Sequence, residues 1–463
     1  MPIDVSGFNE IPSPSLAKQL EEDYGKSANA NREKKRPQKS FELELVEKLI
    51  KTLPPIITLG ERWFVCHDGL WTERRRHHYQ PEALSIIDPK HRTAIMATRV
   101  LRHIEGSCQA KESPFCGAYK FEGADILISV QNGVLRIGEE LSLEPPSRQN
   151  YFTQKLAVAF DPEARCSAFS QALVQNLPDP KDQKLFGLFC ASMLVPDCRW
   201  EAALCCYGET GTGKSTLFEG IQAMLGKGPC QALSLAELCD QKSYNAPDLE
   251  FAMLNLSTEL NALELTSDRF KQLVSGERVP VRAIYGSPYY IDPTCKYAGL
   301  ANHLPRFKDG TGAELRRFRF LKFTLLPVHK DLELKKRIAA EGSGILNLLV
   351  GLVPKLLKLP EMPGGGQDGE QARERFQIAN DPVGTFVRRE CVLDLKAYES
   401  KSRLEAHFKT YLEHNGLRET IAPILFQQLY ERFNVAPVRR RDGGKREQGV
   451  AGIELKPITE SSL

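Results

Sequence analysis

The sequence has no uninterrupted apolar run of about 18 residues, the length that a helix needs to cross a bilayer, so we expect no membrane partner. It begins without a positively charged segment followed by an apolar one, so no secretion signal is expected. It also lacks a C-x-x-C pair, which argues against a zinc knuckle. Buried thiols and surface histidines are therefore the favoured interpretation of the scattered candidates Cys66, His67, His77, His78, Cys108 and Cys116.

A strong net charge is missing as well. The chain has 62 Lys and Arg against 59 Asp and Glu, a net charge of +3, which neither favours nor excludes a nucleic-acid partner. The 12 cysteines are scattered, and Cys205 and Cys206 lie inside an apolar run, as suits reduced thiols in a cytoplasm. A length of 463 residues with 41% hydrophobic content predicts a globular chain of roughly two to four domains.

A glycine-rich segment stands between an apolar run, residues 202–207, and an amphipathic stretch that contains Leu217 and Ile221. The segment consists of Gly208, Glu209, Thr210, Gly211, Thr212, Gly213, Lys214, Ser215 and Thr216. Glycines allow backbone N–H groups to face phosphate oxygens, and the helix N-terminus adds a positive dipole. Lys214 is expected to reach the β- and γ-phosphates of ATP, and the Ser215 hydroxyl to complete a Mg²⁺ shell. The strand–loop–helix context favours this interpretation over a chance glycine-rich turn.

Three further features follow within an alternation of apolar strands and amphipathic stretches that predicts an α/β core with a parallel sheet. Glu259 ends an apolar run that we expect on a strand neighbouring the phosphate loop, where its carboxylate would activate water. Asn302 ends a third such run and is either a sensor amide or an ordinary turn residue. Arg316 and Arg317 are either surface ion-pair partners or donors to a phosphoryl group across a subunit boundary.

In this order the motifs resemble the superfamily-3 helicases, and most closely the helicase part of phage and plasmid primase-helicases, which are related to the poxvirus-type replication ATPase. The resemblance rests on GETGTGKST, Thr258-Glu259, Phe270 to Glu277, Asn302-His303-Leu304-Pro305 and Arg316-Arg317-Phe318. It covers residues 125 to 455, with further matches such as Ala159-Phe160-Asp161-Pro162 upstream and Asp381-Pro382-Val383 downstream.

The resemblance implies an AAA+-like P-loop ATPase core that binds ATP and Mg²⁺, with Lys214, Glu259, Asn302, Arg316 and Arg317 as catalytic residues. Ser215 and Glu259 are the implied magnesium positions. Relatives often carry a second acid where Thr258 stands, so the magnesium contact would rest on Ser215 and water. A finger arginine that acts on a neighbour implies a homo-oligomeric ring, usually a hexamer. No acidic cluster for nucleotidyl transfer is present, so we expect no primase activity.

The DNA contacts are expected in two places. In the family, the region between Gly276 and Asn302 forms a hairpin in the ring channel, and here Tyr285 could stack on a base. The C-terminal module resembles a winged helix with a basic wing, which could equally be a soluble loop or a protein-docking wing. The candidate phosphate contacts are Lys271, Arg278, Arg282, Lys296, Arg439, Arg440, Arg441 and Lys445.

The expected domains are a disordered tail (1–40), an N-terminal α/β region (41–124), a helical domain (125–198), the ATPase core (199–330), a helical lid or connector (331–385) and a winged-helix domain (386–463). The expected function is ATP-dependent unwinding of single-stranded or forked DNA during replication of a phage, plasmid or integrated element. Replication proteins in the cytoplasm of a bacterial host would be its partners. The alternatives are an origin-binding ring that uses ATP only to assemble, and a ring ATPase that remodels proteins.

Overall fold

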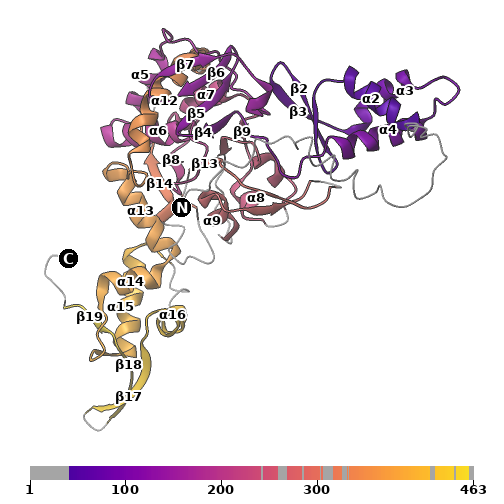
Figure 1. Cartoon of the computed structure of the whole chain (residues 1–463). Helices are drawn as coiled ribbons and strands as arrows, with labels where there is room; N and C mark the ends of the chain where they lie inside the picture. Colours follow the sequence, from indigo (N-terminus) through magenta and orange to yellow (C-terminus); the bar gives the residue numbers. More distant parts are fainter. Residues whose placement is uncertain are drawn as a thin grey trace, which may run out of the picture. The chain divides into compact units, whose positions relative to one another are not determined.

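The computed structural model describes residues 41–240, 243–258, 268–283, 286–302, 304–305, 316–325, 331, 333–417, 423–442 and 445–457. The chain divides into two units. One combines Met1–Leu53 with His77–Ser107, and the other combines Pro54–Arg76 with Cys108–Leu463. Figure 1 shows the chain coloured along the sequence.

The described residues of the first unit are mainly helical. Its helices are α2 (Phe41–Thr52), α3 (Gln80–Ile86), which follows the 3-10 helix η1 (Arg76–Tyr79), and α4 (Ala94–Ser107). Leu45 and Leu49 on α2 and Ile104 on α4 are buried at helical spacing, and this apolar face holds the helices together.

The second unit begins with two antiparallel sheets. The first sheet contains β1 (Ile56–Leu59), β2 (Arg62–His67) and β3 (Leu70–Arg74); the second contains β4 (Tyr119–Glu122), β5 (Asp125–Val130), β6 (Gly133–Ile137) and β7 (Leu141–Glu144). The hairpin at Asn132-Gly133 has the register Val130↔Gly133. The expected domain boundary between residues 124 and 125 is wrong, because it separates the hydrogen-bonded strands β4 and β5.

A mixed α/β region with a parallel five-stranded sheet follows, which confirms the α/β prediction. Its strands are β8 (Ala203–Tyr207), β9 (Cys230–Gln231), β10 (Leu254–Ser257), β13 (Lys296–Ala301) and β14 (Phe318–Lys322). Their spatial order is β14-β8-β13-β10-β9, and every pairing is parallel. The short antiparallel pair β11 (Val279–Val281) and β12 (Tyr289–Ile291) lies between β10 and β13 in sequence.

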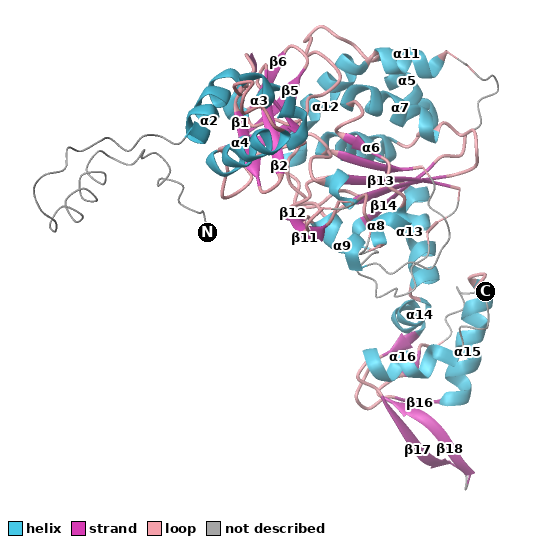
Figure 2. Cartoon of the chain, turned by 90° about the vertical axis from the view of Figure 1, so that its right-hand side faces the viewer, coloured by secondary structure: helices cyan, strands magenta, loops and turns pink. Residues whose placement is uncertain are grey.

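Helices cover both faces of this sheet, as Figure 2 shows. Successive strand residues point to opposite faces, so Leu204 and Cys206 join one core while Ala203 and Cys205 join the other. The helices of the first core are α5 (Ser167–Asn176), α6 (Pro180–Ser192), α7 (Lys214–Leu225), α11 (Leu334–Ala340) and α12 (Gly342–Leu357). Those of the second are α8 (Leu235–Cys239), which precedes the 3-10 helix η3 (Ala246–Leu249), α9 (Asp268–Ser275) and α13 (Gln367–Asn380).

The C-terminal part has its own hydrophobic core around Phe386, Phe408 and Leu429. Its elements are α14 (Pro382–Glu390), β15 (Cys391–Val392), β16 (Tyr398–Ser400), α15 (Lys401–His414), α16 (Leu425–Arg432), β17 (Ala436–Asp442), β18 (Lys445–Ala451) and β19 (Glu454–Leu455). Strands β17 and β18 form an antiparallel hairpin that continues into β16. The expected boundary between residues 385 and 386 is wrong, because it cuts α14 and removes its first half from this core.

Among the residues that the structure describes, no single helix is long and apolar enough to cross a bilayer. Helices α11 and α12 together have the length and apolar composition of a membrane span, but the chain bends by 63° between them.

Candidate active site

The glycine-rich loop 208–213 joins the carboxyl end of β8 to the first residue of α7. Gly208 and Gly213 have φ angles of 147° and 86°, a region that residues with side chains rarely adopt. A Cβ atom on Gly208 would lie 2.1 Å from the Phe323 carbonyl oxygen, and one on Gly213 would lie 2.4 Å from Asn176 Oδ1. The loop therefore needs glycine at both positions, for conformation and for space.

Lys214 closes this loop from the inside. Its side chain is buried, and Nζ donates to the Gly208 carbonyl oxygen at 2.5 Å and to the Glu209 carbonyl oxygen at 2.7 Å. Burial lowers the pKa of this ammonium, because the charged form has lost part of its hydration. Ser215, the next residue, is exposed on the first turn of α7.

Asn302 joins Lys214 at the same edge of the sheet. The register Tyr207↔Ala301 places the residue after β13 beside the loop, where the Gly208 N–H donates to the Ala301 carbonyl at 3.1 Å. Lys214 Nζ lies 3.4 Å from Asn302 Oδ1. The structure thus brings together two predicted site residues that are far apart in sequence.

The strand order corrects one expectation. We expected the strand that leads to Glu259 to be the neighbour of β8, but β13 lies between β8 and β10. The reason is the connection through β9, which takes the chain to the far edge of the sheet before β10 and β13 return towards β8. Thr258 follows β10 directly, and Glu259 lies outside the described residues.

Asn176, at the C-terminus of α5, lies beside the glycine-rich loop and was not among the predicted residues. Its side-chain amide packs against Gly213, and the side chain is half-buried. An asparagine at the end of a helix is normally interpreted as a cap, so no sequence signal distinguishes it from that common role.

Arg316 and Arg317 lie at the amino end of the strands, opposite the phosphate loop. They precede β14, whose first residue Phe318 is in register with Ala203, the first residue of β8. Five strand residues at about 3.3 Å each separate this end from the phosphate loop by about 16 Å. The two side chains also differ: Arg316 is exposed, whereas Arg317 donates to Ser275 Oγ at 2.6 Å and pairs with Glu201 Oε2 at 3.0 Å.

Lys296 is not a DNA contact. It is the first residue of β13, its side chain is 5% exposed, and Nζ donates to the carbonyls of Val195, Asp197 and Thr294 at 3.1, 2.6 and 2.6 Å. An ammonium held by three carbonyl oxygens inside the protein cannot reach a DNA phosphate, so this prediction is wrong.

The other candidate phosphate contacts are placed as follows. Arg278 and Arg282 are exposed; the Arg278 guanidinium lies 5.3 Å from the centre of the Tyr290 ring, and Arg282 Nε donates to the Gly286 carbonyl at 2.9 Å. Lys271 pairs with Asp268 at 3.3 Å. Tyr285 lies outside the described residues.

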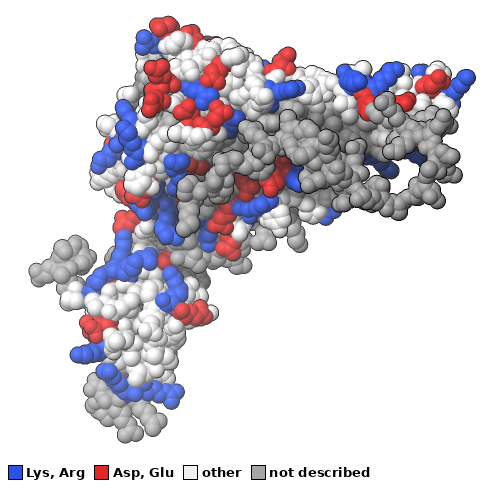
Figure 3. Space-filling model, viewed as in Figure 1, with Lys and Arg blue, Asp and Glu red and all other residues white. Residues whose placement is uncertain are grey.

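On the C-terminal hairpin, Arg439 and Arg440 are exposed on β17, and the Arg440 guanidinium lies 4.2 Å from the centre of the Tyr398 ring. Arg441 and Lys445 belong to β17 and β18, in register with Arg446 and Asp442. Figure 3 shows basic side chains on the described part of this hairpin.

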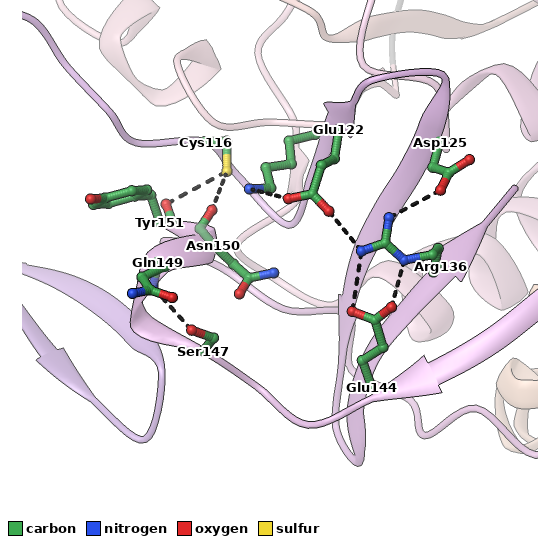
Figure 4. Close-up of polar contacts among 10 residues, drawn as sticks. Cys116, Glu122, Asp125, Arg136, Glu144, Ser147, Gln149, Asn150 and Tyr151 are labelled. Carbon is green, nitrogen blue, oxygen red and sulfur yellow. Dashed lines mark hydrogen bonds and ion pairs between the residues drawn. The ribbon is translucent and has the colours of Figure 1, made fainter. Parts of the chain in front are cut away.

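The N-terminal cysteines and histidines offer little to a metal. The Cys116 thiol faces the carbonyl oxygens of Asn150 and Tyr151, each at 3.5 Å (Figure 4), and burial raises its pKa to about 12. Such a thiol stays protonated, whereas a metal needs the thiolate. Among the described residues, no three His, Cys, Asp or Glu side chains are grouped closely enough to hold a metal ion.

The sequence matches a family described as a family of unknown function, DUF5906, over residues 206–317. That segment contains the phosphate loop, Asn302 and both arginines. No curated protein matches the sequence.

The fold is similar to that of the A-form apo structure of the NrS-1 C-terminal region, with a TM-score of 0.56, 14% identity, and coverage of 90% of this chain and 100% of that chain. A second apo structure of the NrS-1 C-terminal region gives a TM-score of 0.53 and 12% identity, with coverage of 90% of this chain and 100% of that chain. At these identities the likeness shows a shared fold.

Proposed function

We propose that the chain is an ATP-driven DNA helicase of the superfamily-3 kind, which unwinds DNA during the replication of a phage, plasmid or integrated element. One observation carries the proposal: Lys214 Nζ meets Asn302 Oδ1 at 3.4 Å, beside a glycine loop at the carboxyl edge of a parallel sheet. Ligands of open α/β sheets bind at this edge, where the strand order reverses.

The loop suits the triphosphate of ATP as substrate. Lys214 donates to two loop carbonyls, and phosphate oxygens, which carry full charge, are stronger acceptors for the same ammonium. Glycine keeps the loop clear of Cβ atoms, so its backbone can approach the phosphates. The exposed Ser215 hydroxyl would hold Mg²⁺, which when bound draws charge from the phosphate oxygens.

The inserted strand β13 gives the site its spacing. Neighbouring strands lie about 4.8 Å apart, so β8 and β10 are separated by about 10 Å. This gap accommodates a terminal phosphate beside Lys214 and a water molecule beyond it. Asn302 would orient this water, and Glu259, two residues past the end of β10, would accept its proton.

From its position, Arg316 can act only on the nucleotide of an adjacent subunit. An arginine that lies about 16 Å from its own phosphate loop, by strand length, cannot stabilise charge on its own nucleotide. It can reach the nucleotide of an adjacent copy if the subunits pack edge to edge, and a closed ring of such contacts, a hexamer as in the resembled family, follows.

DNA would be held by the exposed arginines Arg278 and Arg282, which flank β11, and by the C-terminal part. We propose that this part is a winged-helix domain with β17 and β18 as its wing. Arg439, Arg440, Arg441 and Lys445 on the wing would neutralise backbone phosphates.

The test is the rate of ATP hydrolysis with and without forked DNA, followed by strand separation. Wild type should hydrolyse ATP, and DNA should accelerate the reaction, whereas Lys214→Ala should abolish it. Lys227→Ala, which alters an exposed lysine just beyond the C-terminus of α7, is the matched control and should behave as wild type. Turnover retained in Lys214→Ala would refute the proposed active site. Hydrolysis that DNA does not stimulate would favour a ring that only assembles on ATP or one that remodels proteins.

A further inference from the structure

A pocket of about 310 Å³ lies in the second unit, between the β4 end of the antiparallel sheet and the base of the β11–β12 pair. Its walls contain the aromatic residues Phe115, Tyr119, Phe121, Phe251 and Tyr290. Small-molecule sites commonly have volumes from about 300 Å³ upward and aromatic linings, and this pocket shares no residue with the candidate active site.

Direct contacts hold the two walls in place. The Tyr119 hydroxyl is buried and lies 3.0 Å from the Thr294 carbonyl oxygen and 2.9 Å from Thr294 Oγ1. Gly117 packs so closely on the turn before β10 that a Cβ would lie 2.5 Å from the Phe251 carbonyl oxygen. Hydrogen bonds and close packing therefore fix the two walls of the cavity relative to each other, and no loop rearrangement is needed to form it.

Two exposed rings stand at the rim. Tyr290 is 60% exposed and Phe121 is 36% exposed, although both are large aromatic groups. An arginine guanidinium lies over each ring. That of Arg278 lies 5.3 Å from the centre of the Tyr290 ring, and that of Arg199 lies 5.8 Å from the centre of the Phe121 ring. Aromatic rings beside arginines are the platform on which single-stranded nucleic acids stack their bases.

The charges around the pocket nearly cancel. Glu250 is neutralised by Arg62, whose Nη2 lies 2.9 Å from Glu250 Oε2, and Lys120 lies 3.7 Å from Glu122. Figure 4 shows Glu122 turned towards Arg136, which also holds Asp125 and Glu144. Arg199 pairs with Asp197, and Asp292 adds an exposed carboxylate to the lining. A nearly neutral pocket with exposed rings suits an uncharged base better than a phosphate.

We propose that this pocket binds a nucleobase of single-stranded DNA, with Tyr290 and Phe121 as its stacking surfaces. The proposal rests on the proposed helicase function and adds to it a site that grips a base without reading its sequence. Because stacking involves no phosphate, the affinity that this site contributes should be insensitive to salt.

The experiment measures binding of fluorescein-labelled oligo(dT) to the full chain by anisotropy, with Mg²⁺ and a non-hydrolysable ATP analogue, at low and high salt. Tyr290→Ala and Phe121→Ala should each weaken binding at least fivefold, by the same factor at both salt concentrations. Tyr290→Trp keeps a stacking ring and should bind at least as tightly as wild type. Phe41→Ala removes a ring of similar exposure, 44%, from the helical unit and should change nothing.

The outcomes separate this proposal from the proposed function. If wild type hydrolyses ATP and binds oligo(dT), but both alanine variants bind equally tightly, the pocket proposal alone fails. If the variants weaken binding mainly at low salt, they disturb phosphate contacts, and base stacking is refuted. If wild type binds no single strand, both proposals fail. Thermal melting of each variant identifies a loss of binding that is caused by misfolding, and Tyr290→Trp then decides, because weak binding by this folded ring-bearing variant refutes stacking.

Discussion

Lys214 and Lys296 are buried to a similar degree and both donate to backbone carbonyls. Lys214 lies at the carboxyl end of the parallel strands, and Lys296 lies at their amino end. Their acceptors differ. Those of Lys214 belong to a glycine loop that begins directly after β8, whereas those of Lys296 belong to Val195, Asp197 and Thr294, which precede β8 and β13. A lysine whose acceptors stand in a glycine loop can exchange them for a ligand. A lysine that ties separate segments together serves the fold.

Arg316 and Arg317, at the amino end of the strands, differ in the same way: one side chain is exposed and the other is held by its own chain. This difference predicts the largest effect of a substitution, which is on ATP turnover. Arg316→Ala should lower ATP turnover by about a thousandfold or more while nucleotide binding persists, because an arginine finger stabilises charge only in the transition state. Arg317→Ala should retain most of the turnover, since this side chain is held by Ser275 and Glu201 of its own chain. Rates of hydrolysis and binding of a fluorescent ATP analogue measure both effects.

Mixing subunits tests whether the finger acts on a neighbour. Lys214→Ala and Arg316→Ala should each be nearly inactive alone, but an interface between an intact Lys214 site and an intact Arg316 should restore a complete centre. Partial recovery of hydrolysis on mixing is therefore expected. Equal losses in Arg316→Ala and Arg317→Ala, or no recovery on mixing, would contradict the division of roles.

The next effect concerns stability. Lys296→Met keeps the aliphatic stem but removes the donor from three carbonyl oxygens, and each unsatisfied buried group costs roughly 1–3 kcal/mol. Loss of the buried charge offsets part of this cost, so we expect the free energy of unfolding to fall by about 3 kcal/mol. The melting temperature should drop by several degrees while hydrolysis per folded molecule is unchanged. Lys227→Met, at an exposed position, is the control; an unchanged melting temperature in Lys296→Met would show that the three contacts stabilise nothing.

The sequence predicts the residues at the carboxyl end of these strands far better than those at the amino end. The strand, loop and helix around Lys214 are contiguous, so local patterns are enough to place them, and Asn302 follows a strand that is recognisable by itself. The insertion of β13 between β8 and β10 depends on long-range pairing, for which no local pattern exists. Lys296 looks like a charged residue at the exposed start of a strand, and only the tertiary contacts of its ammonium reveal its burial.

The smallest predicted effect is on pH dependence, and it separates a ligand-binding lysine from a structural one. Burial lowers the pKa of Lys214 in the nucleotide-free protein, whereas bound phosphate would favour the charged form and raise it. Between the lowered pKa and the ordinary lysine value, the unfolded chain binds more protons than the folded one, so the Lys214 contribution to stability rises with pH.

Over the same window ATP binding must take up a proton, so affinity should fall as pH increases, by at most about tenfold per pH unit. Lys214→Arg keeps its charge throughout and should remove this slope, even if its affinity is lower, because a guanidinium does not deprotonate in this range. Titration of a fluorescent ATP analogue from neutral to alkaline pH measures the slope for wild type, Lys214→Arg and Lys227→Ala. A wild-type affinity that stays flat would mean that the Lys214 ammonium keeps its proton without phosphate, and that its loop carbonyls hold the charge as firmly as a ligand does.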